Sequence, residues 1–140
     1  MDVSASDKTR LLQKLADQAA GALHLPADRI FRQLSNREEL GSTGTGSGIA
    51  VPHARIEGVK KPLGILARLK RPMDFDAIDG KPVDLVFLLL LPTTPAGEQL
   101  NALASVARRL RNSECLRSLR RAVDCSDLFQ AFIAANGASK

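Results

Sequence analysis

The stretch Val83-Asp-Leu-Val-Phe-Leu-Leu-Leu-Leu91 decides the fold of this 140-residue chain. Asp84 is its one polar residue, and Pro92 follows it directly. A short, almost uninterrupted apolar run that ends at a proline is typical of a strand whose two faces are both covered. We therefore expect a strand over Val83–Leu91 at the centre of a sheet that has helices on both sides.

The segments on either side of this run supply the other elements of such a fold. Residues Leu63–Leu69 and Ile49–His53 read as strands, and Asp79-Gly80 as a tight turn. Helical spacing of apolar residues predicts helices at Thr9–Leu23, from Pro26 to between Ser35 and Glu39, at Ala96–Arg111, at Ser113–Ala122 and at Asp124–Ala135. The order of elements predicts a three-layer α/β/α fold with a mixed sheet, in one domain spanning 1–140 with its core at about 9–135.

The net charge of +5 does not describe a basic surface suited to nucleic acid. Six arginines and a single acid, Glu114, lie between Arg108 and Arg121, and the rest of the chain sums to zero. Tyr and Trp are absent, so stacking of bases on aromatic side chains is not expected. We predict no nucleic-acid partner and interpret the arginine segment as a solvated face or as a docking surface for an acidic protein.

Composition also limits metal, redox and membrane roles. Cys115 and Cys125 form no CxxC pair and have no histidine cluster around them, so we expect two reduced thiols and no metal site. The N-terminus is polar, and the longest apolar run is too short to cross a bilayer. We predict a cytoplasmic protein that does not insert into a membrane.

The most unusual segment is the glycine-rich loop Gly41–Gly48, which precedes His53. It fails the Walker pattern because Ser47 and Gly48 stand where Lys and Ser/Thr are required. We expect it to form neither a helix nor a packed strand. Its backbone N–H groups and hydroxyls can surround a phosphoryl group that a histidine carries, with Arg37 neutralising oxygens. A merely flexible loop and a structural histidine remain an open alternative at this point.

Three motifs carry a more specific resemblance: Arg37-Glu38, Gly41-Ser-Thr-Gly44 and Gly48-Ile-Ala-Val-Pro-His53. Together with the segment from Phe75 to Pro92, they resemble type-2 enzyme IIA domains of the bacterial phosphoenolpyruvate phosphotransferase system, the fructose/mannitol class. The strings are more similar to the nitrogen-regulatory branch than to the sugar branch.

The resemblance implies a phosphoryl carrier and gives individual residues their roles. His53 would accept phosphate, through Nε2, from a phosphohistidine on an HPr-like carrier protein. Arg37 and Glu57 would lie at the same site, and Ser42, Thr43, Ser47 and Gly48 would bind the phosphoryl group. Transfer between two imidazoles needs no metal, so no cofactor is expected.

Three departures from the family pattern qualify this expectation. Gln99 stands where many members carry a second active-site histidine, and its amide can donate a hydrogen bond but supplies no charge. Thr45 replaces an apolar residue. Few residues precede the first helix, which predicts that the sheet lacks the family's N-terminal edge strand.

Three functions are compatible with these residues. The first is a stand-alone, nitrogen-type regulatory IIA whose phosphorylation state controls a downstream protein. The second is a sugar-specific IIA that passes phosphate to a IIB component for transport, which Gln99 disfavours. The third is a non-catalytic binding module, which the presence of His53, Arg37 and Glu57 disfavours.

Overall fold

The structure is a computed structural model, and it describes residues 2–60, 62–77, 79–93 and 96–124. The described residues form two compact units, one within residues 2–95 and the other made by residues 96–124. The prediction of a single domain over 1–140 stays a prediction.

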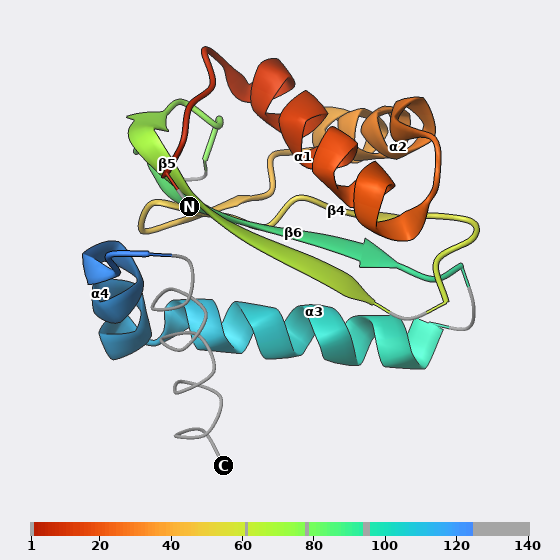
Figure 1. The fold of residues 1–140 in the computed structure, drawn as a ribbon. Helices are drawn as coiled ribbons and strands as arrows, with labels where there is room; N and C mark the ends of the chain where they lie inside the picture. Colours follow the sequence, from red (N-terminus) through yellow and green to blue (C-terminus); the bar gives the residue numbers. More distant parts are fainter. Residues whose placement is uncertain (1, 61, 78, 94–95, 125–140) are drawn as a thin grey trace. The chain divides into compact units, whose positions relative to one another are not determined.

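A six-stranded mixed sheet forms the centre of the first unit (Figure 1). Its longest pairing is antiparallel, between β5 (Leu63–Met73) and β6 (Val83–Leu91). The other side of β6 pairs in parallel with β3 (Ile49–Ala50) and β4 (His53–Arg55), and β2 (Gly44–Gly46) continues the sheet beyond β3. Every residue of β6 except Asp84 is buried, so the predicted strand with two covered faces is confirmed.

Two helices, α1 (Lys8–Leu23) and α2 (Ala27–Glu39), cover one face of this sheet (Figure 1). Asp7 caps α1 by accepting a hydrogen bond from the Arg10 amide, and Pro26 stands immediately before α2 rather than inside its first turn. The helices and the sheet share one hydrophobic core, whose fully buried members include Leu11, Leu15, Ile30, Leu34, Ile56, Phe75, Leu88 and Leu90. The helices predicted at Thr9–Leu23 and after Pro26, and the mixed α/β class, are confirmed.

The prediction that the sheet lacks an N-terminal edge strand is wrong. Residues Asp2–Val3 form β1, which pairs in parallel with β5 at Arg68 and Leu69. Val3 packs against the core, and the Lys14 ammonium donates a hydrogen bond to the Ser4 carbonyl, which ties this segment to α1. One apolar residue and one long-range hydrogen bond therefore add a strand that the polar sequence does not suggest.

The glycine-rich loop also differs from its prediction. Its middle forms β2, which pairs with β3 through a two-residue turn at Ser47-Gly48. Both turn residues have positive φ, 58° and 80°, as a type I′ hairpin turn requires. The loop was expected to form no strand, but this turn and the contact of the loop with the 74–82 connection stabilise a short hairpin.

The strand predicted at Ile49–His53 is divided into two. Ile49–Ala50 and His53–Arg55 both pair with β6, and Val51-Pro52 separates them. The Val51 amide donates to the Thr43 carbonyl, and Pro52 has no N–H to donate. The interruption lies directly before His53, where it sets the surroundings of the imidazole.

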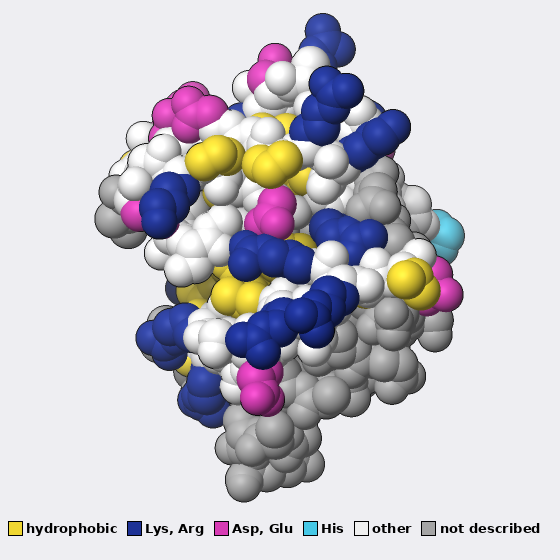
Figure 2. Space-filling view, turned by 90° about the vertical axis from the view of Figure 1, so that its left-hand side faces the viewer, with side chains coloured by type: hydrophobic (Ala, Val, Ile, Leu, Met, Phe, Trp, Pro, Cys, Tyr) yellow, Lys and Arg dark blue, Asp and Glu magenta, His cyan; other side chains and the backbone are white. Residues whose placement is uncertain are grey.

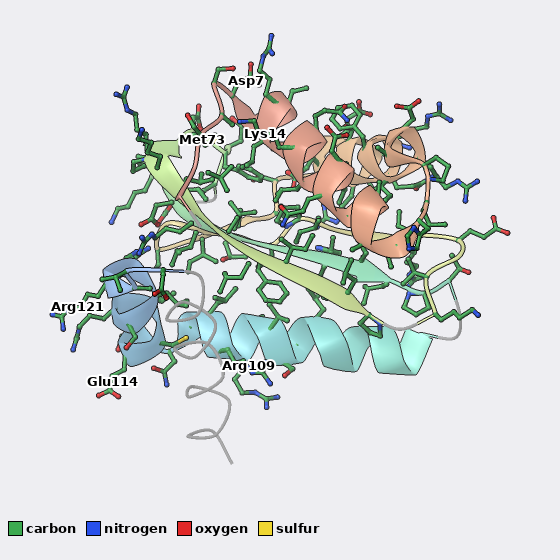
Figure 3. All side chains as sticks on the ribbon, in the orientation of Figure 1. Asp7, Lys14, Met73, Arg109, Glu114 and Arg121 are labelled. Carbon is green, nitrogen blue, oxygen red and sulfur yellow. The ribbon has the colours of Figure 1, made fainter. Side chains whose placement is uncertain are left out.

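The second unit contains α3 (Ala96–Arg111) and α4 (Ser113–Arg121), as predicted. The helix predicted at Asp124–Ala135 lies outside the described residues apart from Asp124 itself. Five of the six clustered arginines occupy the last turn of a helix, where positive charge interacts favourably with the helix dipole: Arg108, Arg109 and Arg111 in α3, and Arg120 and Arg121 in α4. This placement gives most of the basic segment a structural explanation (Figure 3).

The first unit also carries exposed basic residues, at the end of β5. Lys70 and Arg71 are exposed there, and Met73, labelled in Figure 3, marks the end of the strand. Figure 2 faces this side of the molecule, and Lys and Arg side chains gather on it.

In the part of the chain that the structure describes, none of the helices has the length and apolar character needed to span a membrane.

Candidate functional site

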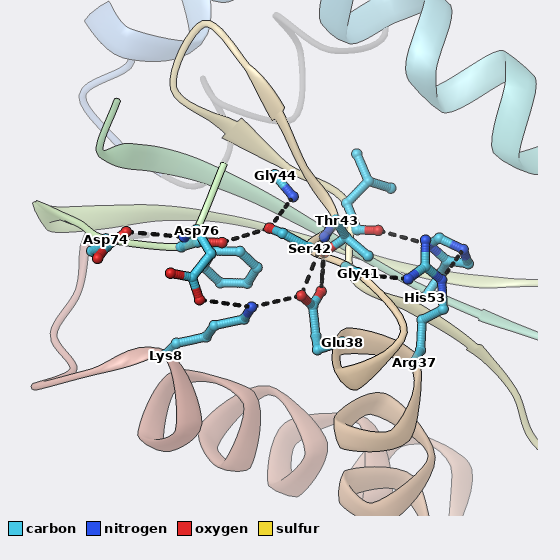
Figure 4. Close-up of polar contacts among 12 residues, drawn as sticks. Lys8, Arg37, Glu38, Gly41, Ser42, Thr43, Gly44, His53, Asp74 and Asp76 are labelled. Atoms are coloured by element: carbon cyan, nitrogen blue, oxygen red, sulfur yellow. Dashed lines mark hydrogen bonds and ion pairs between the residues drawn. The ribbon is translucent and has the colours of Figure 1, made fainter. Parts of the chain in front are cut away.

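His53 is half-buried at the start of β4, and both of its ring nitrogens have a partner (Figure 4). Nδ1 lies 2.8 Å from the Val51 carbonyl oxygen, and the Arg37 Nε donates to Nε2 at 3.3 Å. A carbonyl oxygen can only accept a hydrogen bond, and a guanidinium can only donate one. The Nδ1 atom therefore carries the proton, and Nε2 presents its lone pair on the side of Arg37.

Arg37 is placed by the last turn of α2. The Leu40 and Gly41 amides donate to the Arg37 and Glu38 carbonyls, which closes the C-terminal end of the helix. The Arg37 Nη1 also donates to the Gly41 carbonyl oxygen at 2.8 Å. Two atoms of the Arg37 guanidinium therefore make hydrogen bonds at once, Nη1 to the loop and Nε to the imidazole. These two contacts fix the orientation of the guanidinium plane.

The structure adds Glu38 and Lys8 to the surroundings of the site, although no role was predicted for either. The Glu38 carboxylate accepts hydrogen bonds from the Thr43 amide, at 3.2 and 3.3 Å, and from the Thr43 hydroxyl. The Lys8 Nζ lies 2.7 Å from the Glu38 Oε2, and only 20% of the Lys8 side chain and 7% of the Glu38 side chain are exposed. The sequence signal that could have pointed to Glu38 is its place beside Arg37 in the quoted motif, at the end of a predicted helix.

The predicted phosphate-binding hydroxyls of Ser42 and Thr43 hold the loop itself. Ser42 Oγ donates to the Phe75 carbonyl at 2.5 Å and accepts from the Gly44 amide at 3.0 Å. The Thr43 side chain is buried on Glu38. Figure 4 shows these contacts beside Arg37 and His53, and in the described part of the chain neither hydroxyl bonds directly to His53.

Ser47 and Gly48 are engaged at the far end of the loop. The Ser47 amide donates to the Asp79 Oδ2 at 3.0 Å, and the Gly48 carbonyl accepts from the Asp84 and Leu85 amides. Backbone N–H groups of Lys81 and Ser47 hold the pKa of Asp79 below its ordinary value. The loop is therefore fastened at both ends, by Glu38 and by Asp79.

The remaining predicted site residues are not joined to the imidazole in the described structure. Glu57 is exposed after β4, its backbone carbonyl accepts from Arg29 Nη1 at 3.5 Å, and its side chain makes no hydrogen bond or ion pair with a described residue. Gln99 belongs to α3 of the second unit, and its side chain lies outside the described part of the chain. Their roles at the site stay predictions.

Comparison with known proteins agrees with the motifs. Residues 1–135 match the family model described as phosphoenolpyruvate-dependent sugar phosphotransferase system, EIIA 2. The chain is 40% identical over 134 residues to the nitrogen regulatory protein of Pseudomonas aeruginosa, which covers 95% of this chain and 87% of that protein.

Solved structures show the same relationship. The nitrogen regulatory protein IIA-Ntr of Neisseria meningitidis has a TM-score of 0.89 and 35% identity, and the match covers 94% of this chain and 90% of the other. Enzyme IIAMTL, in a complex with phosphorylated enzyme IIBMTL from Escherichia coli, has a TM-score of 0.77 over 96% of this chain and 92% of its own, and at 14% identity this likeness shows the fold alone. The chain belongs to the EIIA 2 family of the phosphoenolpyruvate-dependent phosphotransferase system, within its nitrogen-regulatory branch.

Proposed function

We propose that His53 Nε2 is the atom that accepts the phosphoryl group. The observation that carries this proposal is the pair of hydrogen bonds on the imidazole, with Val51 on Nδ1 and Arg37 on Nε2. A ring in this tautomer has its lone pair on Nε2, and a lone pair is what nucleophilic attack on phosphorus requires.

The transfer step needs no proton to leave either ring. The bond between phosphorus and the imidazole nitrogen of the donor breaks as the bond between phosphorus and His53 Nε2 forms. The bonding electron pair returns to the donor nitrogen. The proton stays on His53 Nδ1, where the Val51 carbonyl dipole stabilises the positive charge that develops on the ring.

Arg37 would stabilise the negative charge of the incoming group. Its Nε now donates to the acceptor nitrogen, and its Nη1 is held by the Gly41 carbonyl. When phosphorus occupies the lone pair of Nε2, the Nε–H group would turn to a phosphoryl oxygen. A guanidinium fork suits this role because it presents several donors in one plane to the oxygens of phosphate.

The donor in this proposal is an HPr-like phosphocarrier protein, and the exchange takes place in the cytoplasm. In the phosphorylated state the phosphoryl group itself carries roughly two negative charges, which a downstream regulated protein can read directly. Glu57 and Gln99 complete the proposed site on the strength of the family resemblance. Transfer to a IIB component is the alternative, and the nitrogen-regulatory relatives favour a regulatory role.

The proposal is tested by incubating the protein with phosphoenolpyruvate, enzyme I and an HPr-type carrier. We expect an acid-labile phosphate on the wild-type chain and none on His53→Ala. His24→Ala is the matched control, since His24 is the exposed C-cap of α1, and it should be labelled like the wild type. Equal labelling of His53→Ala and wild type would refute the assignment.

A further inference from the structure

We infer that Glu38, supported by Lys8, is a positioning residue that sets both hydrogen bonds of the His53 ring through Thr43 and Arg37. We call the connected residues Lys8, Glu38 and Thr43 the Glu38 network. This inference rests on the proposed function, because it explains how the accepting nitrogen is presented.

The first connection runs from Glu38 to Nδ1 of His53. The Glu38 carboxylate binds the amide and the hydroxyl of Thr43. The Thr43 carbonyl accepts from the Val51 amide at 3.0 Å, and the Val51 carbonyl lies 2.8 Å from His53 Nδ1. Each link fixes the peptide group that makes the next one, so displacement of Thr43 also displaces the acceptor that selects the ring tautomer.

The second connection runs from Glu38 to Nε2 of His53. Arg37 and Glu38 are consecutive residues in the last turn of α2. Glu38 attaches this turn to the loop at Thr43, and Arg37 attaches it to the same loop at Gly41. With the turn held at two points, the Arg37 side chain keeps its Nε directed at Nε2.

Lys8 pairs with the largely buried Glu38 carboxylate. Its ammonium lies 2.7 Å from Glu38 Oε2 and 4.6 Å from the centre of the Phe75 ring. The carbonyl of Phe75 in turn accepts from Ser42 Oγ, so the 74–82 connection is held to the same loop. A buried, hydrogen-bonded acid such as Glu38 restricts the positions of its partners Lys8 and Thr43. Losing one of these contacts would leave a buried polar group without a partner, which is costly in free energy.

The buried Lys8–Glu38 ion pair differs from an ordinary surface ion pair, which contributes little to the free energy of unfolding. The same Lys8 ammonium lies 3.9 Å from Asp76 Oδ2, and the Asp76 side chain is 78% exposed. Asp76 therefore provides a matched control, since it contacts the same lysine but not the loop residues that lead to His53.

The experiment uses two readouts on the full chain. One is the rate of His53 phosphorylation by the enzyme I and HPr-type carrier system. The other is the tautomer of the His53 ring in the unphosphorylated protein, read from nitrogen-15 NMR of the imidazole. The variants are Glu38→Gln, Thr43→Val and Thr43→Ser, with Asp76→Asn as the control.

We expect Glu38→Gln and Thr43→Val to lower the phosphorylation rate by roughly tenfold or more, because misplacement of reacting groups by about 1 Å can lower a rate on the order of 100-fold. Both should shift the His53 ring away from the pure Nδ1–H tautomer. Thr43→Ser retains the hydroxyl, so its phosphorylation rate and ring tautomer should lie between those of Thr43→Val and the wild type. Asp76→Asn should match the wild type. A purely structural role would lower the melting temperature without changing the tautomer.

The outcomes separate this inference from the proposed function. A wild-type chain that takes up no phosphate refutes the proposed function, whereas the ring tautomer still reports on the Glu38 network. If Glu38→Gln and Thr43→Val retain the wild-type tautomer and rate, the inference is overturned. Should Glu38→Gln not fold, Thr43→Val decides the question, since it removes the hydroxyl without changing a charge.

Discussion

The carbonyl oxygen of Val51 lies 2.8 Å from Nδ1 of His53, two residues further along the chain. The contact forms because Val51-Pro52 leaves the strand between β3 and β4, so the Val51 amide pairs with Thr43 while its carbonyl faces the ring. One irregularity in a strand therefore determines which imidazole nitrogen carries the lone pair.

The shape of the Arg37 side chain matters as much as its charge. Its Nε and Nη1 atoms bind His53 and Gly41 together, whereas a lysine has a single nitrogen for both acceptors and lacks the planar fork of the guanidinium. We expect Arg37→Lys to lower the rate of His53 phosphorylation by roughly 100-fold, the order observed when one transition-state donor is removed. The measurement is single-turnover phosphorylation from the HPr-type carrier. Arg32→Lys, an exposed change on the same helix, should leave the rate unchanged, and equal rates for both variants would contradict the prediction.

Gly64 allows β5 to pass beneath the Phe87 ring. A Cβ atom at Gly64 would lie 2.6 Å from Phe87 Cζ and 2.7 Å from Cε1, closer than atoms can approach. We expect Gly64→Ala to destabilise the fold by about 1–3 kcal/mol, measured by urea unfolding, because overpacking forces side chains out of their rotamers. In a Phe87→Leu background the same change should be less damaging. An identical loss in both backgrounds would show that the ring is not the cause.

Asp79 makes the stability of the loop depend on pH. Backbone hydrogen bonds from Lys81 and Ser47 lower the pKa of Asp79 below its ordinary value of 3.8. Because the folded pKa is lowered, the ionised carboxylate stabilises the folded state at pH values above 3.8, the pKa of the unfolded chain. This stabilisation is lost as the pH falls through the lower pKa of the folded state. Asp79→Asn should therefore melt at a lower temperature than the wild type at neutral pH, with the difference shrinking below pH 3.8.

The control for this experiment is Asp17→Asn, which changes an exposed carboxylate on α1. Thermal melts of both variants between acid and neutral pH give the comparison. A difference for Asp79→Asn that does not change with pH would mean that the substitution acts through packing rather than through the ionised carboxylate.

Cys115 should react slowly with alkylating agents in the folded protein. Burial raises the pKa of its thiol, and the nearby Arg109 charge opposes this in part. A raised pKa leaves less thiolate at a given pH, and the thiolate is the nucleophile. We expect iodoacetamide near pH 8 to modify Cys115 several-fold more slowly in native than in urea-unfolded protein, followed by mass spectrometry in a Cys125→Ser background. Equal rates in the two states would exclude protection by the fold.

The elements with a strong local pattern could be predicted. The nearly continuous apolar run of β6 and the regular apolar spacing of α1 and α3 appear in the structure at or within one residue of the predicted bounds. Burial of β6 follows from composition alone, since the seven adjacent apolar side chains of Leu85–Leu91 leave no face suited to water. The pairing of Arg37 with His53 was also expected, but from a motif rather than from periodicity.

The short elements could not be predicted because partners distant in sequence stabilise them. Asp2–Val3 becomes a strand through pairing with Arg68 and Leu69 and through the hydrogen bond between Lys14 and Ser4. The β2–β3 hairpin depends on Asp79, which binds the Ser47 amide from more than thirty residues away. Local propensity disfavours strands in both places, and tertiary contacts outweigh it.

The sequence by itself determined the chemical groups of this protein: a histidine with an arginine sixteen residues before it, a loop of glycines and hydroxyls, and a central apolar strand. Only the tertiary structure decided how these groups are used. It assigned the Ser42 and Thr43 hydroxyls to holding the loop, brought Lys8 and Glu38 together, and placed the proton of His53 on Nδ1. The physical reason is that residue types and their local periodicity are encoded along the chain, whereas the partner of each hydrogen bond depends on which distant peptide and side-chain groups folding brings within reach.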